Sequence, residues 1–100
     1  MKIYFGLDGG ASSTRAVLID SNGKTLIKKK LNQGTNLKVY RDLAPKRITD
    51  LILELCNEIC ISIDDISAFG FGLAAVSYDK GRELFFKELD RLNIADKSIL

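Results

Sequence analysis

The residues best suited to chemistry form one short segment, Asp8 to Thr14, near the start of the chain. Gly9 and Gly10 permit a turn whose backbone N–H groups point into one concavity, and the small side chains that follow let a phosphate group come close. Asp8 is placed to hold a hydrated Mg²⁺ that bridges nucleotide phosphates, because Mg²⁺ keeps several waters and takes one or two carboxylates. The residues expected to surround the phosphate are Gly9, Gly10, Ala11, Ser12, Ser13 and Thr14.

This segment is neither a Walker P-loop nor a Rossmann fingerprint. No Gly-Lys-Ser/Thr follows these glycines at the spacing of a P-loop, and the segment leads into a second apolar run at residues 15–20, where a Rossmann turn would lead into a helix. Asp-Gly-Gly is also an ordinary hairpin turn in which the aspartate accepts backbone hydrogen bonds. Three consecutive hydroxylated residues, with no bulky side chain from Gly9 to Thr14, favour phosphate binding, and a small α/β domain without nucleotide is the alternative.

The elements that must position this turn begin with three expected strands, at residues 3–7, 15–20 and 25–31. Asn22-Gly23 between the second and third strands predicts a two-residue hairpin. Lys28, Lys29 and Lys30 suit a solvated outer strand that is protected against edge pairing, and a basic docking site is the other interpretation.

Two amphipathic helices are expected in the second half of the chain. Apolar residues recur at spacings of three and four after Arg41, with Pro45 in the first turn and a loop at residues 62–65. A fourth strand is expected at residues 66–73, a second helix at residues 79–92, and a further strand begins at residue 97.

The resulting order is three antiparallel strands, then helix, strand, helix and the start of a strand. It predicts an α/β fold with a mixed sheet and helical crossovers, in the order of the ribonuclease H-like folds.

Composition limits the alternatives. One hundred residues make one domain, and a net charge of +2 gives no indication of nucleic acid or an anionic membrane as partner. No apolar run reaches the roughly 20 residues of a membrane span, and the start does not suit a signal peptide, so a soluble cytoplasmic protein is expected. Cys56 and Cys60 lie four apart in the first expected helix, where they would stack on one face, and are interpreted as reduced thiols of the core. Ligation shared with a symmetry mate is the sharper alternative.

The segment from Gly6 to Arg15 resembles the first phosphate motif of the sugar kinase, Hsp70 and actin superfamily. Within it, the segment is similar to the N-acetylglucosamine kinase and BadF/BadG/BcrA/BcrD ATPase group, which usually has Asp/Glu-Gly-Gly-Gly-Thr. Ala11 stands here where glycine is common, and Ser12 where threonine is. The resemblance implies the first part of an actin-like ATPase domain, with ATP and Mg²⁺ as cofactors, Asp8 organising the metal and residues 10–14 holding the β- and γ-phosphates.

The resemblance also implies substrate residues in two later loops. Asn36, after Gly34-Thr35, matches the position where sugar kinases of this group use an asparagine to hydrogen-bond the sugar; a turn asparagine is the local alternative. Ala74 and Ala75 match a small-residue loop that lines the sugar pocket, often with glycine at the second place and an acid two residues later. Ser77 occupies that later position here.

The catalytic base of this group, an aspartate after the fifth strand, and the second phosphate and adenosine motifs would follow residue 100. Residues 1–100 are therefore expected to be a partial N-terminal ribonuclease H-like subdomain, without the rest of that subdomain and without the second domain. No catalytic residue is expected in this chain, which alone should be inactive. An open sheet edge and an exposed apolar helix face predict dimerisation or poor solubility in isolation.

The resemblance implies a parent protein that transfers the γ-phosphate of ATP to an amino sugar or related hexose. The alternatives are an ATPase activator of an acyl-CoA dehydratase and a non-catalytic nucleotide-binding module of the actin fold. The activators usually carry Asp-x-Gly-Ser-Thr followed by lysine, whereas this chain has Asp8-Gly9-Gly10-Ala11-Ser12 and Arg15. These residues do not indicate which sugar accepts the phosphoryl group or what the oligomeric state of the parent protein is.

Overall fold

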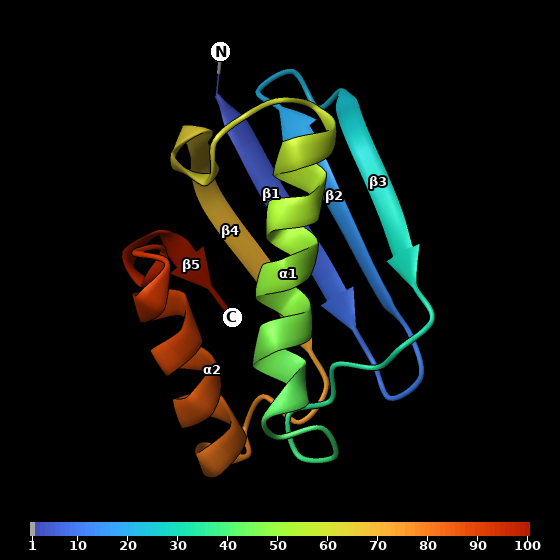
Figure 1. Cartoon of the computed structure of the whole chain (residues 1–100), viewed down its shortest axis with the longest axis vertical. Helices are drawn as coiled ribbons and strands as arrows, with labels where there is room; N and C mark the ends of the chain where they lie inside the picture. Colours follow the sequence, from blue (N-terminus) through green and yellow to red (C-terminus); the bar gives the residue numbers. More distant parts are fainter. Residues whose placement is uncertain (1) are drawn as a thin grey trace.

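A five-stranded mixed sheet organises the chain in a computed structural model that describes residues 2–100. The strands lie in the order β3-β2-β1-β4-β5 (Figure 1). Neighbours β1, β2 and β3 pair antiparallel, whereas β4 pairs parallel with β1 and β5 parallel with β4. The strand bounds are β1 Ile3–Gly9, β2 Thr14–Asp20, β3 Thr25–Leu31, β4 Ile66–Leu73 and β5 Ser98–Ile99.

Two helices make the crossovers between the parallel strands. α1 (Leu43–Glu58) connects β3 to β4, and α2 (Asp79–Arg91) connects β4 to β5, with short 3-10 turns η1 (Ile63–Asp65) and η2 (Ala95–Lys97) before β4 and β5. Both helices lie on the same side of the sheet (Figure 1). The expected α/β fold, with three antiparallel strands followed by helix, strand and helix, is confirmed.

The core lies between this face of the sheet and the two helices. Alternate residues along β1 and β2, and from Phe69 onward in β4, are buried, as the twofold period of a strand requires. Phe5, Phe69 and Phe71 lie on neighbouring strands, and the ring of Phe85 from α2 meets Phe71 edge to face with centroids 5.1 Å apart. Aromatic contacts therefore join α2 to the centre of the sheet.

The connection between β2 and β3 differs from the expected two-residue hairpin. The N–H of Gly23 donates to the carbonyl of Asp20 at 3.0 Å, and Gly23 alone takes a positive φ, of 82°. The Asp20 carboxylate accepts from the N–H groups of Asn22 and Lys24. These bonds favour a type I turn followed by a left-handed glycine over the two-residue turn, which needs two positive φ angles.

The two cysteines do not stack on one helical face as expected. Because α1 ends at Glu58, Cys60 lies beyond it with a φ of 57°. The N–H groups of Cys60 and Ile61 donate to the carbonyls of Asn57 and Cys56, which closes the helix with a Schellman motif. Cys56 is buried, Cys60 is exposed, and both are free thiols.

No helix among residues 2–100 covers the face of the sheet opposite α1 and α2. Tyr4, Val17 and Ile19 are half-buried there, and Lys28 and Lys30 project from it as cross-strand neighbours of Val17 and Arg15. Lys29 points the other way and forms ion pairs with Glu54 and Glu58 of α1. The lysine-rich edge strand thus presents charge on both of its faces.

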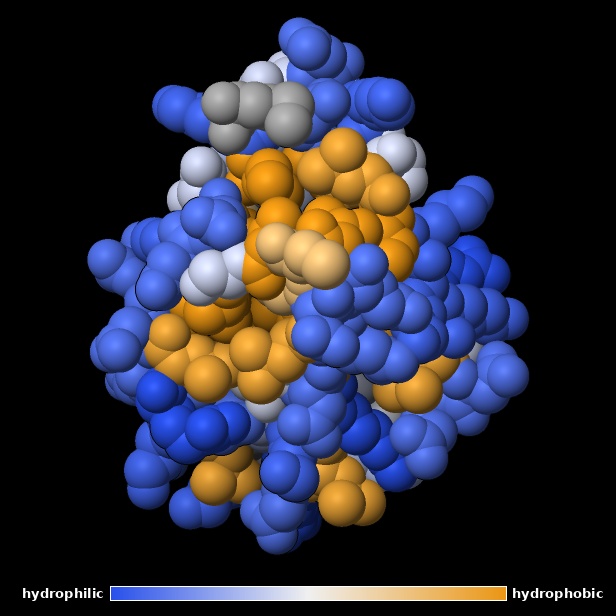
Figure 2. Space-filling view, turned by 45° about the horizontal axis from the view of Figure 1, so that its top comes forward, coloured by the Kyte–Doolittle hydropathy of each residue, from blue (hydrophilic) through white to orange (hydrophobic). Residues whose placement is uncertain are grey.

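Apolar surface also remains visible among the hydrophilic side chains in Figure 2. Within the described part of the chain no helix is long and apolar enough to cross a membrane. The large apolar side chains with the greatest exposure are Val39, Leu43, Leu53 and Ile99.

Candidate functional site

Three loops meet where β1 and β4 end. They are the β1–β2 turn (residues 10–13), the segment between β3 and α1 (residues 32–42) and the loop between β4 and α2 (residues 74–78). The N–H of Thr35 donates to the carbonyl of Gly10 at 2.9 Å, and the N–H of Ala74 donates to that of Gly9 at 2.9 Å. The sequence-predicted phosphate turn therefore lies directly beside both sequence-predicted substrate loops.

Glycines make this close approach possible. A Cβ atom at Gly9 would lie 1.9 Å from the Thr35 hydroxyl oxygen, and one at Gly34 would lie 2.1 Å from the Ala11 carbonyl oxygen. Neither contact is sterically allowed, so both positions need glycine for the turn and the residue 32–42 segment to pack.

The β1–β2 turn offers free N–H donors, and most of its carbonyls are already bonded. The N–H of Gly10 donates to the carbonyl of Ser13 at 3.0 Å, and the carbonyls of Gly9, Gly10 and Ala11 accept from neighbouring loops. The N–H groups of Ala11, Ser12 and Ser13 have no hydrogen-bond acceptor within residues 2–100. Free N–H groups in one turn, with most of the competing carbonyls already bonded, suit an anion such as a phosphate.

Thr14 differs from the other residues of the expected phosphate site. Its side chain is buried, its hydroxyl donates to the carbonyl of Gln33 at 3.0 Å, and it also bonds the hydroxyl of Thr35 at 3.0 Å. With both partners in the residue 32–42 segment, this hydroxyl ties that segment to the start of β2. The hydroxyls near the surface of the turn are those of Ser12, which is exposed, and Ser13, which is half-buried.

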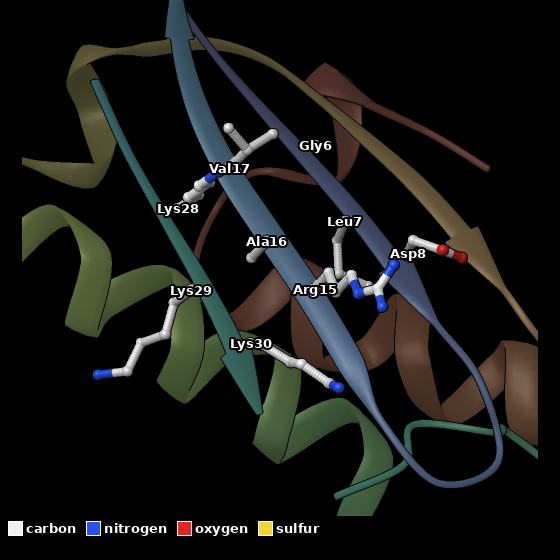
Figure 3. Close-up of a pocket in the computed structure, with 9 residues that line it drawn as sticks. All are labelled: Gly6, Leu7, Asp8, Arg15, Ala16, Val17, Lys28, Lys29 and Lys30. Carbon is white, nitrogen blue, oxygen red and sulfur yellow. The ribbon is translucent and has the colours of Figure 1, made fainter. Parts of the chain in front are cut away.

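Asp8 projects from the uncovered face of the sheet, near the end of β1. It is exposed, pairs with Arg15 across the antiparallel ladder and lies opposite Gly72 of β4. A Cβ atom at Gly72 would lie 4.0 Å from one Asp8 carboxylate oxygen, so the space beside the carboxylate is open. Figure 3 shows Asp8 and Arg15 at one end of a hollow lined by Gly6, Leu7, Asp8, Arg15, Ala16, Val17, Lys28, Lys29 and Lys30.

Whether Asp8 could hold a Mg²⁺ ion depends on how many carboxylates the site offers. Residues 2–100 contain no group of three or more metal-ligating side chains. A single exposed carboxylate beside a turn with free N–H groups fits Mg²⁺, which takes one or two carboxylates and completes its shell with waters and phosphate oxygens.

The side chain of Asn36 is hydrogen-bonded through its oxygen only. Its carboxamide oxygen accepts from the N–H groups of Lys38 at 2.9 Å and Val39 at 3.0 Å, which is the turn chemistry that the sequence also allowed. The NH₂ group of this fixed side chain has no acceptor within the described residues, so it remains available to donate to a ligand.

Ala74 and Ala75 form the inner part of the residue 74–78 loop and are half-buried. The carbonyl of Ala74 accepts from the N–H of Leu37 at 3.1 Å, so both backbone groups of Ala74 hold neighbouring loops. Ala75 has a φ of 61°, a left-handed conformation that an alanine rarely adopts. This conformation explains in physical terms why glycine suits the second place of such a loop.

Sequence reasoning missed three aromatic and basic residues at this edge. The Tyr40 hydroxyl donates to the carbonyl of Ala11 at 2.9 Å, and the Arg47 guanidinium lies 4.8 Å from the centre of the Tyr40 ring. Arg47 also donates to the carbonyl of Gly34 at 2.8 Å. The ring of Tyr78, at the end of the residue 74–78 loop, is approached by the side-chain cations of Lys38 and Arg41. Tyr40 and Tyr78 lie in loops without regular periodicity and Arg47 lies in α1, so no local pattern in the sequence indicated these contacts.

Solved structures with the same fold include YeaZ from Pseudomonas aeruginosa, at a TM-score of 0.60 and 14% sequence identity. A second is an uncharacterized protein with similarity to peptidase YEAZ from Pseudomonas aeruginosa, with the same values. Each match covers 94% of this chain and 41% of the other, so this chain spans about two-fifths of the solved proteins. At this identity the likeness concerns the fold alone.

No curated protein is significantly similar to the chain in sequence. The sequence pattern of the BadF/BadG/BcrA/BcrD ATPase family, in contrast, matches residues 5–94, which include the turn, both adjoining loops and the two helices. The chain therefore belongs to the BadF/BadG/BcrA/BcrD ATPase family.

Proposed function

We propose that the complete protein containing this chain is a sugar kinase, which transfers the γ-phosphate of ATP to a hydroxyl of an amino sugar or related hexose. Family membership supports the use of ATP in general, by hydrolysis or by transfer. The observation that carries the proposal is the β1–β2 turn, where the N–H groups of Ala11, Ser12 and Ser13 are free beside Asp8. ATP would supply the phosphoryl group in the cytoplasm, where it is abundant.

Each part of the site has a proposed role. The N–H groups of the turn and the hydroxyls of Ser12 and Ser13 bind phosphate oxygens, and Asp8 holds Mg²⁺ through water. The Asn36 amide donates to an acceptor hydroxyl, and the backbone of Ala74 and Ala75 shapes the same pocket. Residues beyond this chain are proposed to supply the general base and the second domain, so that the chain alone is inactive.

The hydrogen bonds between loops support transfer over hydrolysis alone. Gly10 bonds Thr35, next to Asn36, and Leu37 bonds Ala74, so the phosphate turn and both acceptor loops form one connected unit. Such a connection is useful when an acceptor must be held in line with a phosphate. An ATPase that drives electron transfer and a non-catalytic nucleotide-binding module are the two competing functions.

Transfer of a radioactive phosphate tests the proposal. We expect the full-length protein, given [γ-³²P]ATP, Mg²⁺ and a panel of hexoses and amino sugars, to produce a labelled sugar phosphate. Labelled inorganic phosphate formed at one rate with every sugar would instead identify a hydrolytic ATPase. Failure to bind Mg-ATP in calorimetry would contradict the nucleotide site itself.

A further inference from the structure

Two exposed cations converge on one aromatic ring at the acceptor side of the site. The Lys38 ammonium nitrogen lies 5.9 Å from the centre of the Tyr78 ring, and the Arg41 guanidinium carbon lies 5.7 Å from it. Both cations are exposed and Tyr78 is half-buried. The three residues come from two different loops, so their meeting depends on the fold and not on sequence proximity.

Their position relative to the site is fixed by short hydrogen bonds. The Asn36 side chain accepts from the N–H of Lys38 at 2.9 Å. On the other loop, the N–H of Tyr78 donates to the carbonyl of Ala75 at 3.0 Å. Lys38 and Tyr78 are thus each hydrogen-bonded to a residue proposed to contact the acceptor sugar, and neither is hydrogen-bonded to the phosphate turn.

The two loops are held closely together below this ring. The N–H of Leu37 donates to the carbonyl of Ala74 at 3.1 Å, and a Cβ atom at Gly81 would lie 2.5 Å from the carbonyl oxygen of Leu37. The first turn of α2 therefore packs directly against the residue 32–42 segment. This packing holds the backbone of the two loops together beside Tyr78.

The charge at this place is not balanced by the protein. Lys38 and Arg41 form no ion pair within residues 2–100, although Asp42 and Asp79 are close in the sequence. Among the described residues only Lys29 and Arg91 have carboxylate partners, so an unpaired cation is common on this surface, and the shared ring of Tyr78 is what distinguishes Lys38 and Arg41. Contact with an aromatic face is a weak interaction at an exposed site, so both cations remain available to an anion.

We propose that Lys38, Arg41 and Tyr78 form a subsite for an anionic group, a carboxylate or a phosphate, carried by the acceptor. This inference rests on the proposed kinase function and narrows its acceptor to a sugar acid or a sugar phosphate. The planar guanidinium of Arg41 binds such oxygens in pairs, the Lys38 ammonium adds a second charge, and the Tyr78 hydroxyl is a further donor.

Steady-state kinetics of the full-length protein tests this subsite with three acceptors: N-acetylglucosamine, glucuronic acid and glucosamine 6-phosphate. We expect one of the two anionic acceptors to have the highest kcat/KM. The variants Lys38→Gln and Arg41→Gln should each raise KM for that acceptor about tenfold, as the loss of one charge-assisted hydrogen bond predicts. The KM for N-acetylglucosamine and the Kd for ATP should change much less. The comparison between the sugar acid and the sugar phosphate identifies which anion is bound.

Lys87→Gln is the matched control, because Lys87 is exposed on α2 and lies outside the three loops. Its acceptor preference should equal that of the wild type. Equal kcat/KM for neutral and anionic acceptors in wild type and variants would overturn the proposal. A rise in the Kd for ATP alone would assign both cations to the nucleotide and would also overturn it.

Calorimetry separates failure of this subsite from failure of the kinase function. If the full-length protein binds ATP but transfers no phosphate, binding of glucuronic acid and glucosamine 6-phosphate is measured directly. Binding that is lost in the Lys38→Gln, Arg41→Gln double variant supports the anion subsite without kinase activity. Absence of binding, or equal binding by the double variant, contradicts it.

Discussion

Among single residues, Tyr40 has the most direct influence on the phosphate turn. Its hydroxyl donates to the carbonyl of Ala11, and its ring is covered by Arg47, which itself bonds Gly34. Tyr40 thus fixes the peptide group that also carries the free N–H of Ser12. It is a positioning residue, since no ligand atom needs to touch it.

The Tyr40→Phe variant removes this hydroxyl and keeps the ring under Arg47. We expect the Kd of the full-length protein for ATP to rise about three- to tenfold, because a neutral hydrogen bond contributes about 0.5–1.5 kcal/mol. AMP, which lacks the β- and γ-phosphates, should bind as before. Titration calorimetry with both nucleotides measures the difference.

Tyr4→Phe is the control for this variant, since the Tyr4 hydroxyl has no hydrogen-bond partner in the described part of the chain. It should leave both affinities unchanged. An equal loss of ATP and AMP affinity in Tyr40→Phe would show that Tyr40 has no specific effect on the phosphate turn.

At the scale of the elements, the end of α1 contains local strain. Cys60 closes the helix with a φ of 57° although it has a side chain, and that side chain is exposed. We expect Cys60→Gly to raise the free energy of unfolding by about 1 kcal/mol, because glycine adopts the left-handed conformation without steric cost. Urea unfolding measures this change.

Asn93 closes α2 in the same way, with a φ of 59°. Asparagine tolerates the left-handed conformation better than cysteine does, so Asn93→Gly should raise the free energy of unfolding less than Cys60→Gly does. A decrease in stability in Cys60→Gly would contradict the role assigned to this helix end.

The contact between the two helices depends on pH through Glu88. Its carboxylate accepts from the Arg91 guanidinium at 2.8 and 2.9 Å and from the buried Thr49 hydroxyl at 2.6 Å. These bonds, with that of Arg91 foremost, lower the pKa of Glu88 from 4.5 to about 2. Because the pKa is lower in the folded state, the carboxylate stabilises the fold above about pH 4.5, and this contribution is lost as the pH falls toward 2.

We expect Glu88→Gln to lower the free energy of unfolding by up to about 1 kcal/mol at pH 6, as for an ion pair with an exposed partner, and to change it little at pH 2. Urea unfolding at several pH values, with wild type alongside, separates Glu88 from the other carboxylates. A destabilisation of equal size at pH 2 and pH 6 would contradict the lowered pKa of Glu88.

For the whole molecule, the periodicity of the sequence was sufficient to predict the sheet and its crossovers. The alternation of β1 and β2 and the three- and four-residue spacing in α1 are local signals, and connection rules predict antiparallel pairing of the first three strands with helical crossovers to the later ones. The position of β4 beside β1 is seen only in the folded chain. Dimerisation through uncovered surface stays a prediction.

The predictions of the β2–β3 turn and of the end of α1 were wrong because these structures depend on interactions that no local sequence pattern indicates. The β2–β3 turn depends on the Asp20 carboxylate, and the end of α1 on a cysteine in a conformation typical of glycine. Tyr40 meets Ala11 across 29 positions of sequence, so only the folded chain reveals that contact. The phosphate turn itself was recognisable because its chemistry is contiguous.

The assignment of Asp8 to the nucleotide site is tested by Mg-ATP turnover of the Asp8→Ala variant of the full-length protein. Asp64→Ala serves as the control, because Asp64 is exposed in η1, before β4, and outside the three loops of the site. We predict that Asp8→Ala lowers turnover at least about a hundredfold, as expected when a transition-state charge loses its stabilisation, while Asp64→Ala behaves as wild type. Turnover by Asp8→Ala at the wild-type rate would contradict the assignment of Asp8 and the β1–β2 turn to the nucleotide.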